Sequence, residues 1–341
     1  MQTQFDWANL GFEYIPTKYK VKAYYKDGKW SKLEVFEEDY IPLHIAATTL
    51  HYGQEAFEGL KAYRGKDGKV RLFRWQENAL RLQSSARRLL MPEVPVEMFH
   101  EAIVTVTKLN KDFVPPYGYG ATFYLRPLLI GSGPKVGVKP ADEYLFLVFG
   151  IPAGAYFKGG FKTQDFLIVR KYDRAAPLGT GNIKAGGNYA AGLIATEEAH
   201  KKGFANALFL DPKEKKYIDE AGPANFFGIK NKTYITPKSN SILPSITNKS
   251  LMQLSEYLGY KVEQRPMPVE ELETLEEAGA CGTAAVITPI GKIVDEDMGK
   301  TYVISKDGNP GPITTELYKT LTGIQFGEID DPFGWTEVID M

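Results

Sequence analysis

The sequence predicts an α+β fold of two domains, each with a mixed sheet and flanking helices. Strand-like and helix-like patterns alternate in both halves without the steady repetition of a single doubly wound sheet. The length of 341 residues favours two domains over one. Glycine, proline and aromatic residues crowd together at 151–161. We therefore expect a smaller N-terminal domain over 1–150, a linker over 151–161 and a larger C-terminal domain over 162–341.

Turn signals and apolar periods predict the elements of the first half. The segment VKAYY and a second run ending at Trp30 flank Asp27-Gly28, which is typical of a hairpin, and a second turn signal at 66–69 separates LKAY from KVRLF. Apolar residues at helical spacing predict helices over 76–90 and 96–110. Two long strands are expected in ATFYLRPLLIG and EYLFLVFGI.

The second half follows the same logic. Strands are expected in DFLIVR, ALFLD and AAVITPIGKIV, and the stretch from 217 to 237 is typical of a hairpin. Helical patterns cover the following four segments: 189–202, LMQLSEYL, VEELETLEEAG and ITTELYKTL. A glycine-rich loop, LGTGNIKAGGNY, precedes the first of these helices.

Composition excludes several classes of protein. The chain has 41 basic and 42 acidic side chains, a net charge of −1, so a dedicated nucleic-acid or membrane-surface binder is not expected. No apolar stretch approaches the roughly 18 residues of a membrane span, and the start lacks the pattern of a signal peptide. The single Cys281 excludes a disulfide framework and a multi-cysteine metal site. We expect a cytoplasmic protein with small-molecule partners and no metal.

Lys184 is the first candidate for chemistry, because glycines flank it on both sides within LGTGNIKAGGNY. The loop lacks the glycine pattern of a dinucleotide or P-loop site. A lysine held against a ligand there would have a lowered pKa and serve as an amine nucleophile. Taken alone, the loop favours an ordinary solvated lysine.

A lysine that carries pyridoxal phosphate needs further groups. The phosphate needs a cation and a helix N-terminus, the pyridine nitrogen a carboxylate, and the ring hydroxyl a donor. The sequence offers Arg81 as the cation and Ile246-Thr247 as the helix N-terminus. It offers Glu220 as the carboxylate and Tyr189 as the donor. Each has an ordinary alternative, namely a solvated helix face for Arg81, a hairpin-end carboxylate for Glu220 and a core tyrosine for Tyr189. The small residues around Thr283 fit either an anion-binding turn or simple packing.

Seven ordered motifs across nearly the whole chain resemble the branched-chain amino acid aminotransferases, which are fold-type IV enzymes dependent on pyridoxal phosphate. These motifs are LHYGQEAFEGLKAY, RLFRWQENALRLQSSARRL, YLRPLLIG, GNIKAGGNYA, DEAGPANFF, ILPSITNKSL and GTAAVITP. The resemblance implies two domains, with the cofactor in the larger one, and a homodimer. It also implies substrates of two kinds, the branched-chain amino acids with their 2-oxo acids, and 2-oxoglutarate with glutamate.

Matched motif by motif, the resemblance gives each candidate a role. It implies that Lys184 is the Schiff-base lysine, Tyr189 the tyrosine near the phenolic oxygen and Glu220 the pyridinium partner. Four residues resemble those that bind the cofactor phosphate in this family, namely Arg81, Ile246, Thr247 and Thr283. Thr283 and Ala284 also match the turn that takes the substrate carboxylate. The remaining substrate residues are Phe12, Phe57, Tyr124 and Tyr156 in the apolar wall, Tyr52 from the neighbouring subunit and Arg126 at the distal carboxylate of glutamate.

The chain also departs from the family pattern. Pro223 and Ala224 precede Asn225, and Ser245 and Asn248 replace the usual glycine and arginine around the Ile-Thr pair. Other functions that share the lysine, the glutamate and the arginine stay open at this point: D-amino acid aminotransferase, aminodeoxychorismate lyase and a non-catalytic carrier of pyridoxal phosphate.

Overall fold

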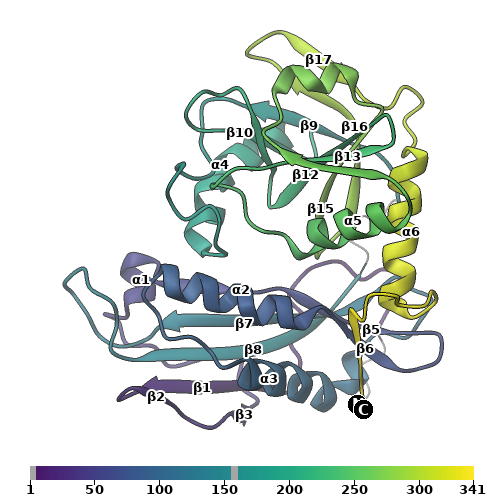
Figure 1. Ribbon diagram of the computed structural model, residues 1–341. Coiled ribbons are helices and arrows are strands. Elements are labelled where there is room, and N and C mark those ends of the chain that lie inside the picture. The colour runs from purple at the N-terminus through teal and green to yellow at the C-terminus, as the bar shows by residue number, and fades with distance from the viewer. Residues whose placement is uncertain (1–4, 155–159) are drawn as a thin grey trace. The chain divides into compact units, whose positions relative to one another are not determined.

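The computed structural model describes residues 5–154 and 160–341 as two units that each contain one sheet (Figure 1). The first unit comprises Met1–Lys158, Ile183–Gly186 and Gly323–Met341. The second unit comprises Gly159–Asn182 and Gly187–Thr322. The α+β class predicted from the sequence is confirmed.

The first unit contains an antiparallel sheet. Its strands are β1 (Lys20–Lys26), β2 (Lys29–Trp30), β3 (Glu34–Phe36), β4 (Glu55–Phe57), β5 (Leu60–Arg64), β6 (Val70–Phe73), β7 (Thr122–Gly131), β8 (Tyr144–Ala153) and β18 (Thr336–Ile339). Their order is β18-β6-β5-β7-β8-β1-β2, with β3 beside β1 and β4 beside β7. Both predicted hairpins and both predicted long strands occur in this sheet.

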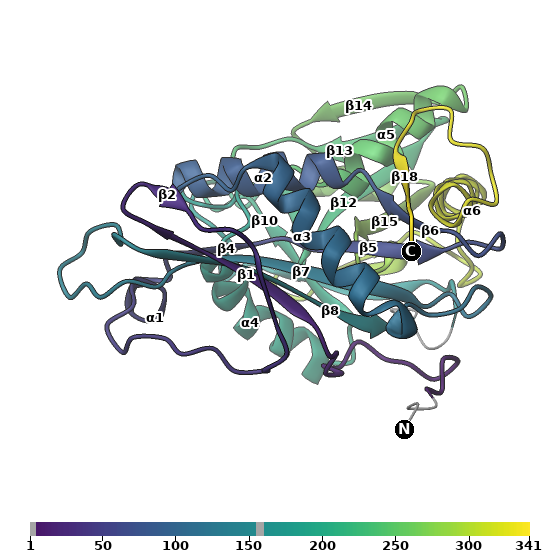
Figure 2. The same cartoon turned by 90° about the horizontal axis from the view of Figure 1, so that it is seen from below.

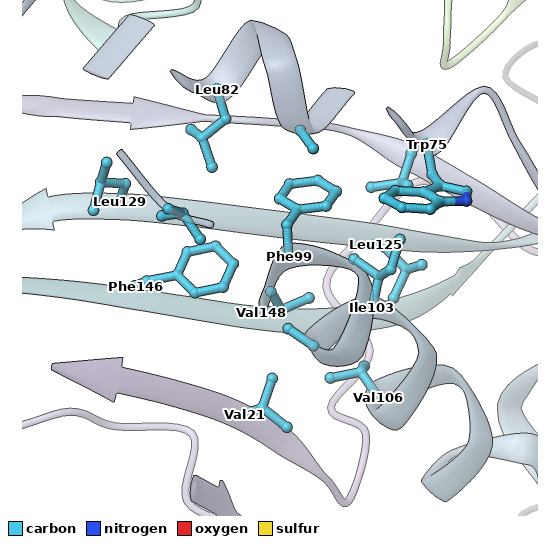
Figure 3. Packing of buried hydrophobic residues seen from close by; sticks show 14 of the residues in the cluster. Val21, Trp75, Leu82, Phe99, Ile103, Val106, Leu125, Leu129, Phe146 and Val148 are labelled. Carbon is cyan, nitrogen blue, oxygen red and sulfur yellow. The ribbon is translucent and has the colours of Figure 1, made fainter. Parts of the chain in front are cut away.

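Helices cover one face of the first sheet. They are α1 (Thr48–Tyr52), α2 (Trp75–Arg88), α3 (Val96–Leu109) and a short 3₁₀ turn, Lys111–Phe113. Figure 2 shows α3 lying across β1, β7 and β8, which it contacts. The apolar stripes of α2 and α3 supply Leu82, Phe99 and Ile103, which pack on Leu125 and Phe146 of the sheet (Figure 3). Because strand side chains alternate, the neighbours of these core residues along β5 and β7 lie on the opposite face.

The second unit contains a mixed sheet. Its strands are β9 (Gln164–Val169), β10 (Asn206–Leu210), β11 (Ile218–Ala221), β12 (Ala224–Lys230), β13 (Thr233–Pro237), β14 (Lys261–Arg265), β15 (Glu277–Gly282), β16 (Val286–Asp295) and β17 (Lys300–Val303). The order is β11-β10-β9-β16-β15-β12-β13-β14, and β11 also pairs with β12, which closes part of the sheet into a ring. The helices are α4 (Gly186–Lys201), α5 (Ile246–Tyr257) and α6 (Pro312–Phe326). None of the helices in 5–154 or 160–341 is both long and apolar enough to span a membrane.

The prediction of a helix over VEELETLEEAG is wrong. Its first part is a 3₁₀ turn, Val269–Thr274, and its second part enters β15, which pairs with β12 and β16. Gly279 is required in this strand, since an added Cβ would lie 2.5 Å from the Phe227 ring. Glu277 accepts the backbone N–H groups of Ile313 and Thr314 at the start of α6. Sheet pairing and this cap outweigh the helical propensity of a glutamate-rich segment.

The predicted domain limits differ from the two units in two places. The C-terminal segment returns to the first unit, because β18 pairs with β6 and the Glu337 carboxylate bonds to Trp75 and His100. Residues 183–186 belong to the first unit as well. The predicted linker, 151–161, begins inside β8, and its residues 155–159 lie outside the described ranges.

Candidate active site

A buried ion pair in the first unit joins α2 to the segment between β4 and β5. Arg81 donates to the carboxylate of Glu58, with Nε 2.7 Å from Oε1 and Nη2 2.8 Å from Oε2. Asn78 also donates to Glu58, at 2.8 Å. Burial acts to raise the pKa of Glu58, but the charges of Arg81 and Lys184 and the bonds from Arg81 and Asn78 hold it below its ordinary value. The Arg81 side chain is 11% exposed, so the alternative of a solvated helix face is wrong.

Lys184 is held through its backbone by two elements of the same unit. Its N–H donates to the Ser85 hydroxyl of α2 at 3.1 Å, and its carbonyl accepts the N–H of Phe57 in β4 at 3.1 Å. Its Nζ lies 4.9 Å from the centroid of the Phe57 ring. A freely solvated loop would have neither constraint. The chain therefore presents the amine of Lys184 from a fixed backbone position beside an aromatic face.

Packing against backbone requires a glycine at 181, whereas a side chain at 186 would displace the end of the Glu55 side chain. A Cβ on Gly186 would lie 1.7 Å from the Glu55 carboxylate, and a Cβ on Gly181 would lie 2.1 Å from the Ser241 carbonyl oxygen. The Gly186 N–H also donates to Glu55. Burial raises the pKa of Glu55, while this hydrogen bond and the charge of Arg126 act in the opposite direction. These glycines allow close approach, as predicted, but the approaching groups belong to the protein itself.

Arg126 lies among aromatic residues on the face of the first sheet that α2 and α3 leave uncovered. Its guanidinium carbon is 4.8 Å from the ring centroid of Phe57 and 5.4 Å from that of Tyr124, and Nη2 donates to the Tyr124 hydroxyl at 3.2 Å. The Phe12 ring meets Tyr124 edge-on at 4.9 Å. The Nε of Arg126 is buried and has no hydrogen-bond partner within the described residues. A buried unsatisfied donor of this kind is suited to an anionic ligand.

The two remaining predicted substrate residues are Tyr52 and Tyr156. Tyr52 is the last residue of α1, is 42% exposed, and donates its hydroxyl to the carbonyl of Val136. Tyr156 lies outside the described residues.

Glu220 is the buried carboxylate of the second unit. It lies on β11, is 2% exposed and accepts the backbone N–H of Leu243 at 2.6 Å and the side-chain amide of Asn225 at 3.1 Å. Its other oxygen is 3.2 Å from Nε of Arg174. The two hydrogen bonds and the nearby Arg174 charge favour one orientation of the carboxylate. Glu220 does lie at the end of the β11–β12 hairpin, as the structural alternative has it, but there it is buried and hydrogen-bonded. The side chain of Asn225 donates to the Glu220 carboxylate although Pro223 and Ala224, which depart from the family pattern, precede it.

The start of α5 is capped by a residue that departs from the family pattern. The Ser245 hydroxyl accepts the N–H of Asn248 at 3.2 Å. The Asn248 side chain bonds to Tyr234 at 2.7 Å and to Thr236 at 3.0 Å. The amides of Ile246 and Thr247 are the first two of the helix, and such amides have no acceptor inside a helix. Ser245 and Asn248 therefore hold the helix terminus without using its first two amides.

Thr283 and Ala284 occupy the turn between β15 and β16. This turn ends at Val286, whose φ of 64° is unusual for a β-branched residue and marks a strained backbone. Both Thr283 and Ala284 are half-buried. Cys281 precedes the turn and is buried, with a pKa raised to about 12 mainly by burial.

Tyr189 lies on α4 and is half-buried, so the alternative of an ordinary core tyrosine does not describe it fully.

Sequence reasoning missed several residues of these two groups. Glu55, Glu58, Ser85 and Arg174 were not candidates. A signal for the glutamates was present, because EAFEGL places two carboxylates among apolar residues of a strand region. The sequence contains no comparable signal for Arg174, whose role depends on β11 lying next to its loop.

Comparison with known proteins supports one family throughout. Residues 55–293 match the amino-transferase class IV family. A branched-chain-amino-acid aminotransferase of Haemophilus influenzae is 53% identical over 337 residues, which cover 97% of each chain. The structure of the Escherichia coli branched-chain amino acid aminotransferase matches with a TM-score of 0.80 at 27% identity, over 95% of this chain and 100% of that one. The structure of the Thermobaculum terrenum branched-chain amino acid aminotransferase, solved in its PLP form, matches with a TM-score of 0.78 at 25% identity, over 96% of this chain and 99% of that one.

These matches decide among the functions that the sequence left open. The predicted family, enzyme class and cofactor are confirmed, and a D-amino acid aminotransferase, a lyase or a non-catalytic carrier is not needed to explain any feature above. The chain belongs to the branched-chain amino acid aminotransferases, enzymes of amino-transferase class IV that depend on pyridoxal phosphate.

Proposed function

We propose that this chain interconverts L-leucine, L-isoleucine and L-valine with their 2-oxo acids, using 2-oxoglutarate and glutamate as the second pair, and that Lys184 is its catalytic residue. The observation that carries the proposal is the setting of Lys184. Its backbone is fixed by Ser85 and Phe57, and its charge acts on the buried Glu58–Arg81 pair. A lysine placed in this way is suited to hold a carbonyl cofactor covalently and to move a proton.

The residues present fit pyridoxal phosphate. Glu220 is a buried, oriented carboxylate, which suits a protonated pyridine nitrogen. Arg81 and the N-terminal amides of α5, at Ile246 and Thr247, suit the phosphate, together with Thr283. Tyr189 would donate to the ring hydroxyl. When bound, the cofactor withdraws electrons from the substrate α-carbon and keeps the amino group between the two half-reactions.

The protein groups then act on the substrate directly. The Nζ of Lys184, once the substrate amine has taken its place, would accept the proton of the α-carbon and pass a proton to the cofactor's former aldehyde carbon, and it would do the opposite in the reverse half-reaction. The amides of the Thr283–Ala284 turn would hold the α-carboxylate. Phe12, Phe57, Tyr124 and Tyr156 would form the apolar wall for a branched side chain.

Arg126 makes the same pocket suitable for an acidic substrate. Its buried Nε lacks an acceptor within the described residues, and its Nη2 is already oriented by Tyr124. A distal carboxylate would satisfy that donor, whereas an isobutyl group would pack on the neighbouring Phe57 and Tyr124 rings. One pocket would therefore take both substrate classes.

A homodimer is part of the proposal. Five apolar residues, Ile45, Leu50, Tyr52, Val136 and Val138, are between 42% and 84% exposed. Their two segments are joined by the Lys135–Ala46 backbone bond and by the Tyr52–Val136 bond. We infer that a second copy covers this patch and receives Tyr52 in its site. Double substitution of Val136 and Val138 by Asp should yield monomers in sedimentation velocity, and an unchanged dimer would contradict the assignment.

A cytoplasmic location, expected from the composition, completes the proposal.

The test is Lys184→Ala in the protein as purified with its cofactor. Transamination should be abolished, and borohydride should no longer fix the cofactor to the protein. Lys171→Ala, a change at a lysine whose side chain is 61% exposed, should leave both unchanged. A persisting borohydride-reducible adduct would place the covalent link elsewhere. Half-reactions of the unmodified protein with L-leucine, D-alanine and aminodeoxychorismate separate the proposed substrate class from the related activities.

A further inference from the structure

The buried side chain of Asn248 ties the first turn of α5 to the sheet of the second unit. Its Oδ1 accepts the Tyr234 hydroxyl at 2.7 Å, and its Nδ2 donates to the Thr236 hydroxyl at 3.0 Å. Thr236 in turn donates to the carbonyl of Phe226 at 2.8 Å. Tyr234 and Thr236 belong to β13, and Phe226 belongs to β12. The start of the helix is therefore joined to two strands through a chain of hydrogen bonds.

The side chains of this hydrogen-bond chain are held rigidly inside the unit. Asn248 is 4% exposed, and Tyr234 and Thr236 are each 1% exposed. The Tyr234 ring stacks on Phe227 of β12, with the ring centroids 4.8 Å apart and the planes 16° from parallel. The helix also contacts β14 and β15 (Figure 1). Stacking thus fixes the ring, and the hydroxyl has a defined position from which to hold Asn248.

Tyr234 contacts a second segment of the proposed phosphate site. Its hydroxyl is also within hydrogen-bonding reach of the Cys281 thiol, on β15. That strand leads directly into Thr283, which is proposed to bind the phosphate together with the start of α5. One buried tyrosine therefore contacts both backbone segments that carry proposed phosphate donors.

Stability of the helix does not require this arrangement. Ser245 already caps α5, because its hydroxyl accepts the N–H of Asn248 at 3.2 Å. Replacing both partners of the Tyr234–Asn248 bond by apolar groups of the same shape would be nearly neutral for the free energy of unfolding. Apolar contact has no preferred direction, whereas a hydrogen bond fixes where its two groups lie. The bond therefore contributes a defined position of the first turn of α5 relative to β13.

We propose that Asn248 and Tyr234 are positioning residues that hold the N-terminal amides of α5, at Ile246 and Thr247, in place for the cofactor phosphate. The inference rests on the proposed role of those amides and extends it to residues that do not touch the phosphate themselves. Helix amides bind an anion by pointing at it, and a hydrogen bond weakens steeply when it is misaligned. A helix start that can shift would bind the phosphate more weakly and leave the contacts of the cofactor ring unchanged.

The experiment titrates the full-length chain, freed of cofactor, with pyridoxal phosphate and with pyridoxal, which lacks the phosphate. In Tyr234→Phe, the Kd for pyridoxal phosphate should rise about three- to tenfold, and the Kd for pyridoxal should change less than about twofold. Ser255→Ala is the matched control, since this buried hydroxyl of α5 donates to the Leu251 carbonyl of its own helix at 2.7 Å. Both Kd values of the control should equal those of the unsubstituted protein.

The double variant Tyr234→Phe/Asn248→Leu separates positioning from support of the fold. It removes both partners of the bond, so its free energy of unfolding should exceed that of Tyr234→Phe and approach that of the unsubstituted protein. The selective loss of pyridoxal phosphate binding should nevertheless remain. Recovery of stability and cofactor binding together would show that the pair only supports the fold. Equal losses for pyridoxal phosphate and pyridoxal, or no loss for either, would also overturn the inference.

Ile246→Pro distinguishes a failure of this inference from a failure of the proposed phosphate site. Proline removes one of the proposed amides and is tolerated at the first position of a helix. Ser245 has φ −74° and ψ 131°, the extended conformation that a following proline favours. A selective loss of pyridoxal phosphate binding in Ile246→Pro but not in Tyr234→Phe would reject the positioning role and retain the site. No selective loss in either variant would reject both.

Discussion

The backbone N–H of Lys184 donates to the hydroxyl of Ser85 at 3.1 Å, and the same hydroxyl donates to the carbonyl of Arg81 at 3.0 Å. Ser85 is therefore a link between the proposed catalytic lysine and the helix that carries the proposed phosphate arginine. Ser85 is fully buried, whereas its neighbour on α2, Ser84, is exposed.

Ser85→Ala should lower kcat and weaken cofactor binding without unfolding the protein. Removal of the hydroxyl leaves the Lys184 N–H without its acceptor, which costs about 1–3 kcal/mol when the donor is kept from water. Cofactor affinity by fluorescence titration and single-turnover rates with leucine measure the two effects. Ser84→Ala is the matched control and should behave as the unsubstituted enzyme. Equal behaviour of both variants would show that the bond does not position Lys184.

Glu58→Gln should destabilise the protein by about 3–5 kcal/mol, because it removes the buried carboxylate that makes two hydrogen bonds with Arg81. Denaturant unfolding at neutral pH measures this loss. The exposed pair of Arg87 with Glu93, whose side chains are 57% and 41% exposed, is the control, and Glu93→Gln should cost less than about 1 kcal/mol. Similar losses in the two variants would contradict a special role for the buried pair.

The Glu58–Arg81 pair should also affect how the free energy of unfolding depends on pH in the acid range. The pKa of Glu58 is lower in the folded protein than its ordinary value of 4.5. The ionised pair therefore contributes stability above about pH 4.5, and this contribution is lost as the pH falls toward the folded pKa. As the pH falls below about 5, the unsubstituted protein should lose stability faster than Glu58→Gln. Parallel curves for the two proteins would show that another carboxylate dominates.

Arg126→Gln should slow the glutamate and 2-oxoglutarate half-reaction much more than the leucine half-reaction. The lost charge-assisted hydrogen bond is worth about 1.5–3 kcal/mol, or roughly 10- to 100-fold in kcat/KM. Pre-steady-state absorbance changes of the cofactor follow each half-reaction separately. Equal losses with both substrates would count against a contact between Arg126 and the distal carboxylate.

Cys281 should resist alkylation in the folded protein. It is 1% exposed, and its pKa of about 12 leaves almost no thiolate at neutral pH. Iodoacetamide at about pH 8 should modify it only after denaturant is added, with the extent read by mass spectrometry. Rapid modification of the native protein would mean that β15 opens readily, and the activity of that product would show whether the adjacent turn at Thr283 tolerates bulk.

Most elements follow from local patterns because the hydrophobic period of a segment depends on few distant contacts. The helix at 76–90 and the long strands at 121–131 and 143–151 were of this kind. The segment 269–279 was different, since its strand form depends on pairing with β12 and β16 and on the cap that Glu277 gives to α6. Likewise, nothing near residues 336–339 in the sequence indicates that they pair with β6.

The sequence by itself determined the family and the cofactor, and it led to the proposal of Lys184, because these depend on ordered motifs that resemble one family across nearly the whole chain. Only the tertiary structure decided which groups neutralise and hold those residues: Glu58 for Arg81, Ser85 for the backbone of Lys184 and Arg174 for Glu220. The physical reason is that a buried charge is stabilised by whichever donor or acceptor the fold brings within about 3 Å, and sequence separation carries no information about that distance.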